Sequence, residues 1–275
     1  MRRPRVCIVT GFGINADEEL AYAFECVGGQ AVRVHVRDLI GAPRLLSTFR
    51  ILAFPGGFSF GDHLGSGKVF ATLFRRTLGA ELAEFIAGGG LVLGICNGFQ
   101  VLVKMGALPN LEGRGTQEVS LIHNDSGKYE DRWVRVRFEE NSRCVWTKGL
   151  PDMDLPVRHG EGKFIVKGDD AMSALTASGL VALRYTARDA GGNDVRYPDD
   201  PNGSDGHVAG ICDLTGRVFG LMPHPEAFLH SENHPQWNFP AVLPRNARRS
   251  LQGEVLRILA NGVRAAAVPW NHRRS

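Results

Sequence analysis

The chain has 275 residues, enough for one large α/β domain or two small ones, and 43% are hydrophobic, so a sizeable core can form. Its net charge of +3 is too small to indicate a nucleic-acid-binding protein. The five cysteines are odd in number and lack C-x-x-C spacing, so we expect a reducing, cytoplasmic location without disulfides. No apolar run reaches membrane-spanning length, so we expect no membrane association.

The first part of the chain alternates strand patterns with helix patterns. Apolar runs predict strands over 6–10, 31–36, 51–54 and 91–93, and helical spacing predicts helices over 17–27 and 69–87. This alternation predicts a mostly parallel central sheet with helices on both faces, a three-layer α/β fold. Ligand sites in such folds lie at the carboxyl ends of the strands.

The pattern changes from Glu118 onward. Apolar and charged residues alternate over 133–138, which predicts a half-exposed antiparallel strand. Further predicted strands cover 181–185, 208–212 and 218–221, and a closing helix covers 251–263. The stretch 190–206 is rich in Pro, Gly and Asp, which predicts a long surface loop. Because we find no repeat and no linker, we expect a single domain over 1–275 with a C-terminal extension from about residue 228.

A cysteine lies at a predicted sharp turn. Gly94-Ile95-Cys96-Asn97-Gly98 follows the apolar run 91–93 and precedes helix-compatible spacing over 99–103. Strand, turn and helix in this order predict a nucleophile elbow, more often built as G-x-S-x-G. The helix dipole favours a thiolate at Cys96, the species that attacks carbonyl groups. The alternative is a small buried cysteine without chemistry.

A cysteine nucleophile needs a base and a group that orients the base. His224 lies just beyond the predicted strand 218–221, between two prolines, and Glu226 is close enough to orient it. The alternative is a solvated surface turn. Backbone amides for an oxyanion hole are available at Gly56-Gly57-Phe58 and at Asn97, although the glycines equally fit an ordinary strand-ending turn.

Two segments resemble nucleotide-binding motifs, but the residues beside each of them argue against nucleotide binding. The segment 11–16 resembles a dinucleotide fingerprint, but the acids at 17–19 would repel a pyrophosphate. The segment 65–68 suggests a phosphate loop, but Val69 replaces the Ser or Thr that holds magnesium. We therefore expect no nucleotide cofactor in this chain.

A zinc site is a minor alternative. His224, Glu226, His230 and His234 cluster in the sequence, but their spacing fits no zinc motif, and Pro235 disfavours one helix carrying them all. We therefore expect no metal.

Several segments together resemble the class I glutamine amidotransferases, and within them the glutaminase subunits of phosphoribosylformylglycinamidine synthases. The matching segments are GINADEE (13–19), PGGFSFGD (55–62), GICNGFQVL (94–102), HGEGKF (159–164) and AGICDLTGRVFGLMPHPE (209–226). The cysteine elbow and the HPE triplet mark the superfamily. GGFSFGD, GICNGFQ and HGEGKF are more specific to this branch.

The resemblance implies a flavodoxin-like fold and a catalytic triad. Cys96 would attack the side-chain amide of L-glutamine, His224 would activate the thiol and protonate ammonia, and Glu226 would orient His224. The substrate-binding residues that the resemblance implies are Gly57, Phe58, Asn97, Gln100, His159, Gly160 and Glu161.

The resemblance also implies a partner. The chain has no recognisable ATP site, so ammonia would pass to a synthetase subunit that uses ATP and magnesium to convert formylglycinamide ribonucleotide to formylglycinamidine ribonucleotide, with a small third subunit in many versions. The alternatives are the glutaminase subunit of another amidotransferase and a non-catalytic regulatory or redox cysteine protein. The segment 230–237 is interpreted as a partner-binding surface or an ordered surface tail.

Overall fold

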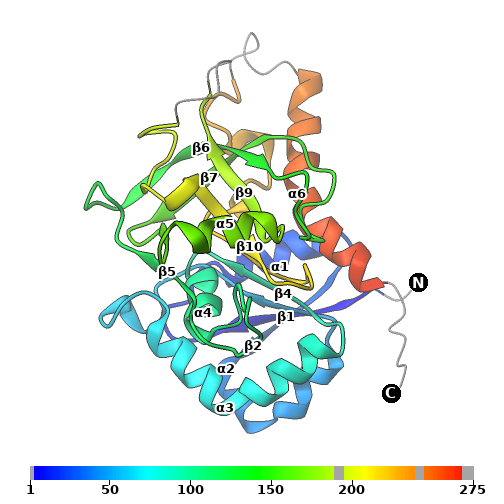
Figure 1. Ribbon diagram of the computed structural model, residues 1–275. Helices are drawn as coiled ribbons and strands as arrows, with labels where there is room; N and C mark the ends of the chain where they lie inside the picture. Colours follow the sequence, from blue (N-terminus) through cyan, green and yellow to red (C-terminus); the bar gives the residue numbers. More distant parts are fainter. Residues whose placement is uncertain (1–2, 189–194, 239–244, 268–275) are drawn as a thin grey trace.

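The structure is a computed structural model that describes residues 3–188, 195–238 and 245–267, and a mixed sheet lies at its centre (Figure 1). In the described residues the nine strands of this sheet follow the order β2-β1-β3-β4-β11-β10-β9-β6-β7. The strands are β1 (Arg5–Thr10), β2 (Gln30–His35), β3 (Ile51–Phe54), β4 (Leu91–Ile95), β6 (Glu130–Phe138), β7 (Met153–His159), β9 (Val181–Thr186), β10 (Val208–Cys212) and β11 (Val218–Leu221). The half from β2 to β11 is parallel and the rest is antiparallel, which confirms a mostly parallel sheet joined by antiparallel strands, but β11 from the second half of the chain belongs to the parallel part.

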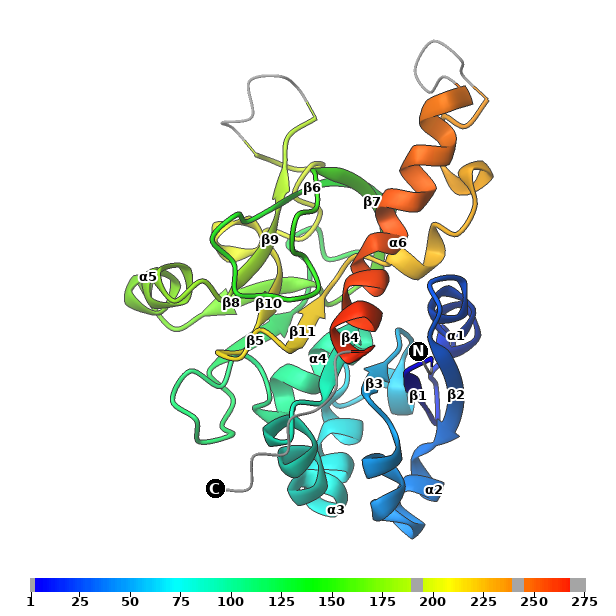
Figure 2. The ribbon, with the colours of Figure 1, turned by 90° about the vertical axis from the view of Figure 1, so that its right-hand side faces the viewer.

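Helices cover both faces of the sheet, which confirms the three-layer prediction (Figures 1 and 2). The α-helices are α1 (Asp17–Cys26), α2 (Val36–Gly41), α3 (Lys68–Ala87), α4 (Asn97–Met105), α5 (Asp169–Ala177) and α6 (Arg245–Ala267). Helices α3 and α4 pack together on one face, and α1 and α6 pack together on the other. A small antiparallel pair, β5 (Val119–Ile122) and β8 (Lys163–Val166), lies beside α4. No described helix is long and apolar enough to cross a membrane.

Short 3-10 turns connect these elements. They are η1 (Pro43–Thr48), η2 (Ser59–Asp62), η3 (Asp205–His207), η4 (Pro225–Ala227) and η5 (Ser231–Asn233). The turns η2 and η4 follow the carboxyl ends of β3 and β11, on either side of β4 in the sheet. Both turns therefore border the carboxyl end of β4, where Cys96 lies.

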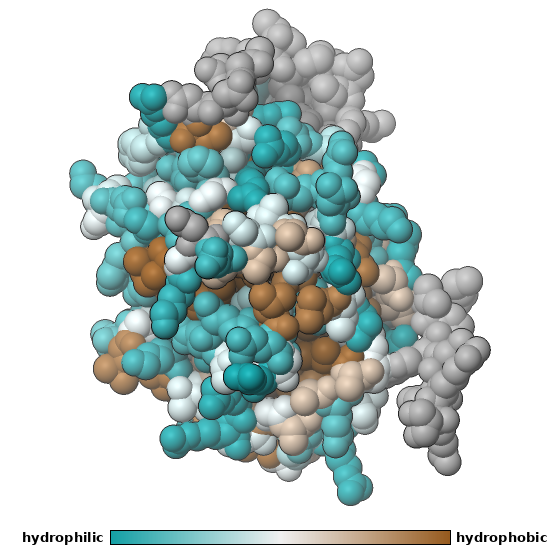
Figure 3. All heavy atoms as spheres, viewed as in Figure 1, coloured by the Kyte–Doolittle hydropathy of each residue, from teal (hydrophilic) through white to brown (hydrophobic). Residues whose placement is uncertain are grey.

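The central strands explain why the parallel half was predictable. All residues of β3, β4 and β11 are buried, because helices cover both faces of a parallel sheet and each strand becomes a continuous apolar run. Strand β6 instead alternates buried and more exposed residues over most of its length. Outside the core, the face seen in Figure 3 is mostly hydrophilic, with hydrophobic residues in small groups.

Several elements were not predicted. The sequence analysis did not identify α2, α5, β5, β7 or β8, which are short or, in β7, interrupted by Pro156. The closing helix is also longer than predicted, Arg245–Ala267 in place of 251–263. These elements are stabilised by tertiary contacts, which local apolar spacing does not encode.

The prediction of a simple surface loop over 190–206 is wrong for 200–204, whereas 196–198 are exposed as predicted. Asp200, Asn202 and Ser204 are at most 5% exposed. The Asn202 amide donates to the Gly162 carbonyl at 2.9 Å, and the Phe164 N–H donates to the Ser204 hydroxyl at 2.9 Å. This segment therefore supports the turn between β7 and β8. Residues 190–194 lie outside the described residues.

The segment after residue 228 packs into the body of the protein. Gly262 of α6 lies against Trp146 so closely that a Cβ there would be 2.0 Å from the indole ring, and the Asn261 amide donates to the Trp146 carbonyl at 2.9 Å. His234 is 4% exposed and lies edge-on to Trp133, with ring centroids 4.9 Å apart. The interpretation of 230–237 as a surface tail or partner surface is therefore wrong for His234. The assignment of 1–275 to a single domain stays a prediction.

Candidate active site

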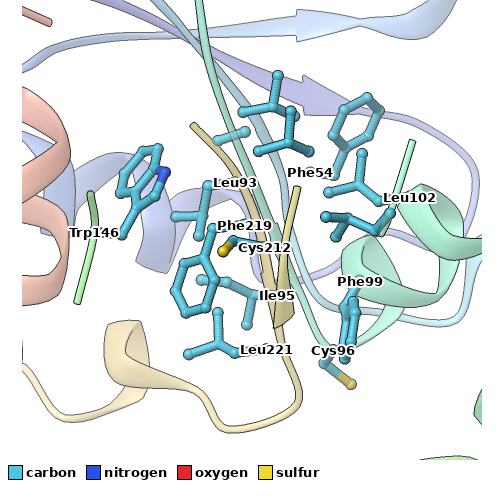
Figure 4. Close-up of a cluster of buried hydrophobic side chains, with 14 of the residues drawn as sticks. Phe54, Leu93, Ile95, Cys96, Phe99, Leu102, Trp146, Cys212, Phe219 and Leu221 are labelled. Atoms are coloured by element: carbon cyan, nitrogen blue, oxygen red, sulfur yellow. The ribbon is translucent and has the colours of Figure 1, made fainter. Parts of the chain in front are cut away.

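The predicted strand, turn and helix around Cys96 are present. Strand β4 ends at Ile95, α4 begins at Asn97, and Cys96 between them has φ 50° and ψ −106°, a conformation unusual for a non-glycine residue. A Cβ at Gly98 would lie 1.9 Å from the Phe54 carbonyl oxygen, so only glycine lets α4 approach β3 this closely. Figure 4 shows Cys96 beside Phe99 at the edge of the buried cluster, with its sulfur pointing away from the cluster.

His224 and Glu226 form a buried pair next to this turn. The His224 backbone N–H donates to the Pro156 carbonyl at 2.8 Å, which anchors the segment after β11 to β7. The two side chains are 3% and 0% exposed, and the imidazole Nδ1 lies 2.6 Å from Glu226 Oε1. At this distance the Nδ1–H donates to the carboxylate, which leaves Nε2 as the reactive nitrogen. Nε2 has no hydrogen-bond partner among the described residues.

Gly56 brings the imidazole and the cysteine together. A Cβ built on Gly56 would lie 2.7 Å from His224 Cε1 and 3.6 Å from Cys96 Cβ, so both side chains border the same glycine. The thiol of Cys96 donates to the Arg158 carbonyl at 3.5 Å.

Charges at the site favour the protonated form of the His224 imidazole. Burial lowers the pKa of His224, but the charges of Glu226 and Cys96, together with the hydrogen bond to Glu226, outweigh burial and raise it to about 10. His224 is therefore an imidazolium at neutral pH. A cysteine, a buried histidine and a carboxylate in this arrangement can attack a carbonyl group and protonate its leaving group.

Two backbone amides beside Cys96 are available to a developing oxyanion. Within the described residues, the N–H groups of Gly57 and Asn97 donate to no protein group. Asn97 is the first residue of α4, where the N–H has no helical partner. Gly57 has φ +149°, and a Cβ there would lie 2.6 Å from the Gly13 carbonyl oxygen, so the loop requires glycine.

A small cleft of about 70 Å³ is lined by Gly57, Cys96 and His224, among other residues. Its lining residues are Asn15, Gly57, Phe58, Cys96, Tyr129, Arg158 and His224. Phe58 and Tyr129 are 44% and 51% exposed, with ring centroids 6.1 Å apart. Sequence reasoning gave no role to Asn15, Tyr129 or Arg158. For Arg158 a signal existed, because it directly precedes the HGEGKF segment.

Five of the predicted substrate-binding residues do not line this cleft: Asn97, Gln100, His159, Gly160 and Glu161. Gln100 is buried, and its amide donates to the Glu161 carbonyl at 2.5 Å and accepts from the Asn97 side chain at 3.0 Å. The His159 ring is 3.1 Å from Asn124 Oδ1, and burial, followed by the charge of His224, lowers the pKa of His159 to about 3. These residues connect α4 to the turn after β7. That they, with Gly160, contact glutamine stays a prediction.

A larger cavity of about 630 Å³ lies on the other side of this connection. Glu161 lines it together with Asp62 and Lys104. The Lys104 ammonium is buried without a hydrogen-bond partner among the described residues. Burial lowers the pKa of Lys104, and the carboxylates of Glu161 and Asp62 act in the opposite direction. Glu161 therefore belongs to the wall of this cavity.

The described residues contain no group of three or more His, Cys, Asp or Glu side chains placed to hold a metal ion. The histidines of the candidate zinc cluster serve separate contacts. His224 binds Glu226, and His234 lies 3.7 Å from Asp154. His230 instead faces Tyr22, with ring centroids 6.4 Å apart.

Comparison with known proteins identifies the family. The sequence pattern of the CobB/CobQ-like glutamine amidotransferase domain matches residues 3–264. The chain belongs to this glutamine amidotransferase family. It is 40% identical over 266 residues to phosphoribosylformylglycinamidine synthase subunit PurQ from Dehalococcoides mccartyi, covering 97% of this chain and 99% of that protein. It is 41% identical over 236 residues to the same subunit from Methanococcus maripaludis, covering 85% and 86% of the two chains.

A solved structure supports the same assignment. A chain of the PurLQS structure from Thermotoga maritima superposes with a TM-score of 0.68 at 28% sequence identity, over 95% of this chain and 98% of that one. The chain is thus a glutamine amidotransferase of the α/β fold that its sequence predicts, and the resemblance stated from its motifs is confirmed.

Proposed function

We propose that this chain is the glutaminase subunit of a phosphoribosylformylglycinamidine synthase. Its relatives named for this subunit match nearly the full chain, and its site holds the groups that amide hydrolysis needs. The observation that carries the proposal is the buried His224–Glu226 pair, 2.6 Å apart, bordering the same glycine as Cys96 at the apex of the elbow.

In the first half of the reaction, the Cys96 thiolate attacks the side-chain carbonyl carbon of L-glutamine. The carbonyl oxygen becomes an oxyanion that accepts hydrogen bonds from the Gly57 and Asn97 N–H groups. The His224 imidazolium donates its Nε2 proton to the departing nitrogen. The carbon–nitrogen bond breaks, ammonia leaves, and a glutamyl thioester forms on Cys96.

In the second half, neutral His224 takes a proton from water, and the resulting hydroxide attacks the thioester carbon. The carbon–sulfur bond breaks, the thiolate is restored beside the imidazolium, and glutamate leaves after its new carboxyl group ionises. Throughout the cycle Glu226 accepts the Nδ1–H of His224 and stabilises the positive charge on the ring.

Ammonia is then consumed by the partner synthetase subunit. That subunit uses ATP and magnesium to convert formylglycinamide ribonucleotide to formylglycinamidine ribonucleotide, and a small third subunit completes the assembly in some versions. We place the activity in the cytoplasm, because all five cysteines, each in the described part of the chain, are free thiols.

Two other functions were considered. A glutaminase that serves a different synthetase would need the same triad, so the acceptor substrate distinguishes it. A regulatory or redox-sensing cysteine protein needs no buried His–Glu pair, and the fixed orientation of His224 therefore favours catalysis.

The test is a coupled assay with the purified chain, the synthetase subunit, L-glutamine, ATP and magnesium. We expect glutamate release and formylglycinamidine ribonucleotide formation with the wild-type chain. Cys96→Ala should abolish both, while the same complex supplied with ammonium chloride should still form product. Product formation from another acceptor, with none from formylglycinamide ribonucleotide, would assign the chain to a different synthetase.

A further inference from the structure

Arg158 brings a positive charge next to the catalytic pair. It lies at the end of β7, lines the Cys96 cleft and has a side chain that is 32% exposed. Its guanidinium is 3.0 Å from Glu19 Oε2, 3.4 Å from His224 Nδ1 and 4.0 Å from Glu226 Oε1. The Arg158 side chain thus lies next to the His224 ring and the Glu226 carboxylate, and it binds the Glu19 carboxylate on α1.

The contact between the Arg158 guanidinium and His224 Nδ1 is not a hydrogen bond when Nδ1 carries the hydrogen. Nδ1 already donates its hydrogen to Glu226, so it cannot also accept from Arg158. The guanidinium therefore acts on the imidazolium as a like charge. Glu226 Oε2 is fully buried and has no hydrogen-bond partner among the described residues.

We propose that Arg158, held by Glu19, is a positioning residue that sets the charge balance of the Cys96–His224 pair. This inference rests on the proposed glutaminase activity. A fixed cation here stabilises the thiolate and destabilises the imidazolium. The active ion pair exists in the pH range between two steps, the ionisation of the Cys96 thiol and the loss of a proton from the His224 imidazolium. With Arg158 present, both steps occur at lower pH than they would without it.

Glu19 limits this effect. Its carboxylate neutralises part of the guanidinium charge and keeps the guanidinium 4.0 Å from Glu226, so the pair between His224 and Glu226 stays intact. Glu19 is 44% exposed on α1, outside the cleft. A change in the Arg158–Glu19 contact at the surface of α1 would therefore change the pKa of His224.

The other charged or titratable groups around the site come from four elements. They are Cys96 at the elbow, Glu226 in η4, His159 in β7, Tyr129 directly before β6, and Asp131 in β6, whose backbone lies opposite Arg158 in the sheet register. His159 carries no charge near neutral pH, because its pKa is lowered to about 3. The pKa of Tyr129 is raised, chiefly by burial, so Tyr129 is also neutral there.

The experiment measures kcat and KM for glutamine, in the complex with the synthetase, from about pH 5 to about pH 11. Arg158→Gln is expected to move both limbs of the pH profile upward by about one unit, the lower end of the effect of a neighbouring charge. Arg158→Lys should restore both limbs toward their wild-type positions. Glu19→Gln should move both limbs downward, by less. Arg33→Gln removes a cation that binds the α1 acids Asp17 and Glu18 outside the cleft, and should leave both limbs in place.

Opposite shifts in the Arg158→Gln and Glu19→Gln variants support the inference. A fall in kcat by the same factor at every pH, with unmoved limbs, would overturn it and reduce Arg158 to a structural residue. If Arg158→Gln does not fold, the Glu19→Gln and Arg158→Lys profiles decide. An inactive wild-type complex contradicts the proposed function, whereas an active one with unmoved limbs contradicts only this inference.

Discussion

Gly56→Ala should displace the His224 imidazole without removing any side chain of the proposed triad. Gly56 is buried between His224 and Cys96, and the added Cβ would lie 2.7 Å from His224 Cε1. Non-bonded carbon atoms approach to roughly 3.5 Å, so the ring must retreat by about 0.8 Å. A misplacement of about 1 Å costs roughly 100-fold in rate, so we expect kcat to fall by that factor.

The same substitution should leave the protein folded. Overpacking of a buried site costs roughly 1–3 kcal/mol, which is less than the stability of a typical domain of this size. The assay is glutamate release by the complex with the synthetase, with the melting temperature measured in parallel. Gly79→Ala in α3 is the matched control, because its nearest neighbour, Arg75 Cγ, is 3.8 Å away, an ordinary contact. A folded Gly56→Ala protein with wild-type kcat would refute the placement of His224 against Cys96.

Three further results are expected. Gly98→Ala should prevent stable folding, because its Cβ would meet the Phe54 carbonyl oxygen at 1.9 Å, and the yield of folded protein with its circular dichroism checks this. Glu226→Gln should lower the pKa of His224 from its value of about 10, so the basic limb of the glutaminase pH profile should move to lower pH; an unmoved limb would contradict the role of Glu226. The pKa of His159 is about 3 in the folded protein, against 6.5 for a histidine in an unfolded chain. Between these pH values the unfolded chain therefore binds one more proton than the folded protein does. The free energy of unfolding consequently falls as the pH falls through this range. His159→Gln should reduce that slope by up to about 1.4 kcal/mol per pH unit, measured by urea denaturation at several pH values.

Local sequence was sufficient for much of the fold. The parallel strands were predictable because burial on both faces makes each one a continuous apolar run, as in β3 and β4. The elbow was predictable because its glycines and the cysteine between them lie within five consecutive residues. Strand β7 was not, because Pro156 and its charged residues give no clear period and its pairing with β6 supplies the stability.

The site was only partly predictable for the same reason. The contact between His224 and Glu226 is local, two residues apart in the chain, and its motif predicted it. Arg158 is distant in the chain from both Glu19 and His224. Its position directly before the HGEGKF segment indicates that it lies near the site, but not that it contacts these two side chains. The hydrogen bond from the Gln100 amide to the Glu161 carbonyl could not be predicted either, because it depends on how closely α4 approaches the turn after β7.

The sequence by itself determined the chemistry of this protein: a thiol at a strained turn, a histidine with its carboxylate, and glycines that leave backbone amides free. Those features arise from contacts between near neighbours in the chain, which residue order dictates. Only the tertiary structure decided that β11 lies parallel beside β4, which brings His224 to Cys96 across Gly56, and that β7 places a guanidinium next to them. Strand order depends on how whole surfaces of the sheet and helices are buried against one another, so it cannot be predicted from any short segment of the sequence.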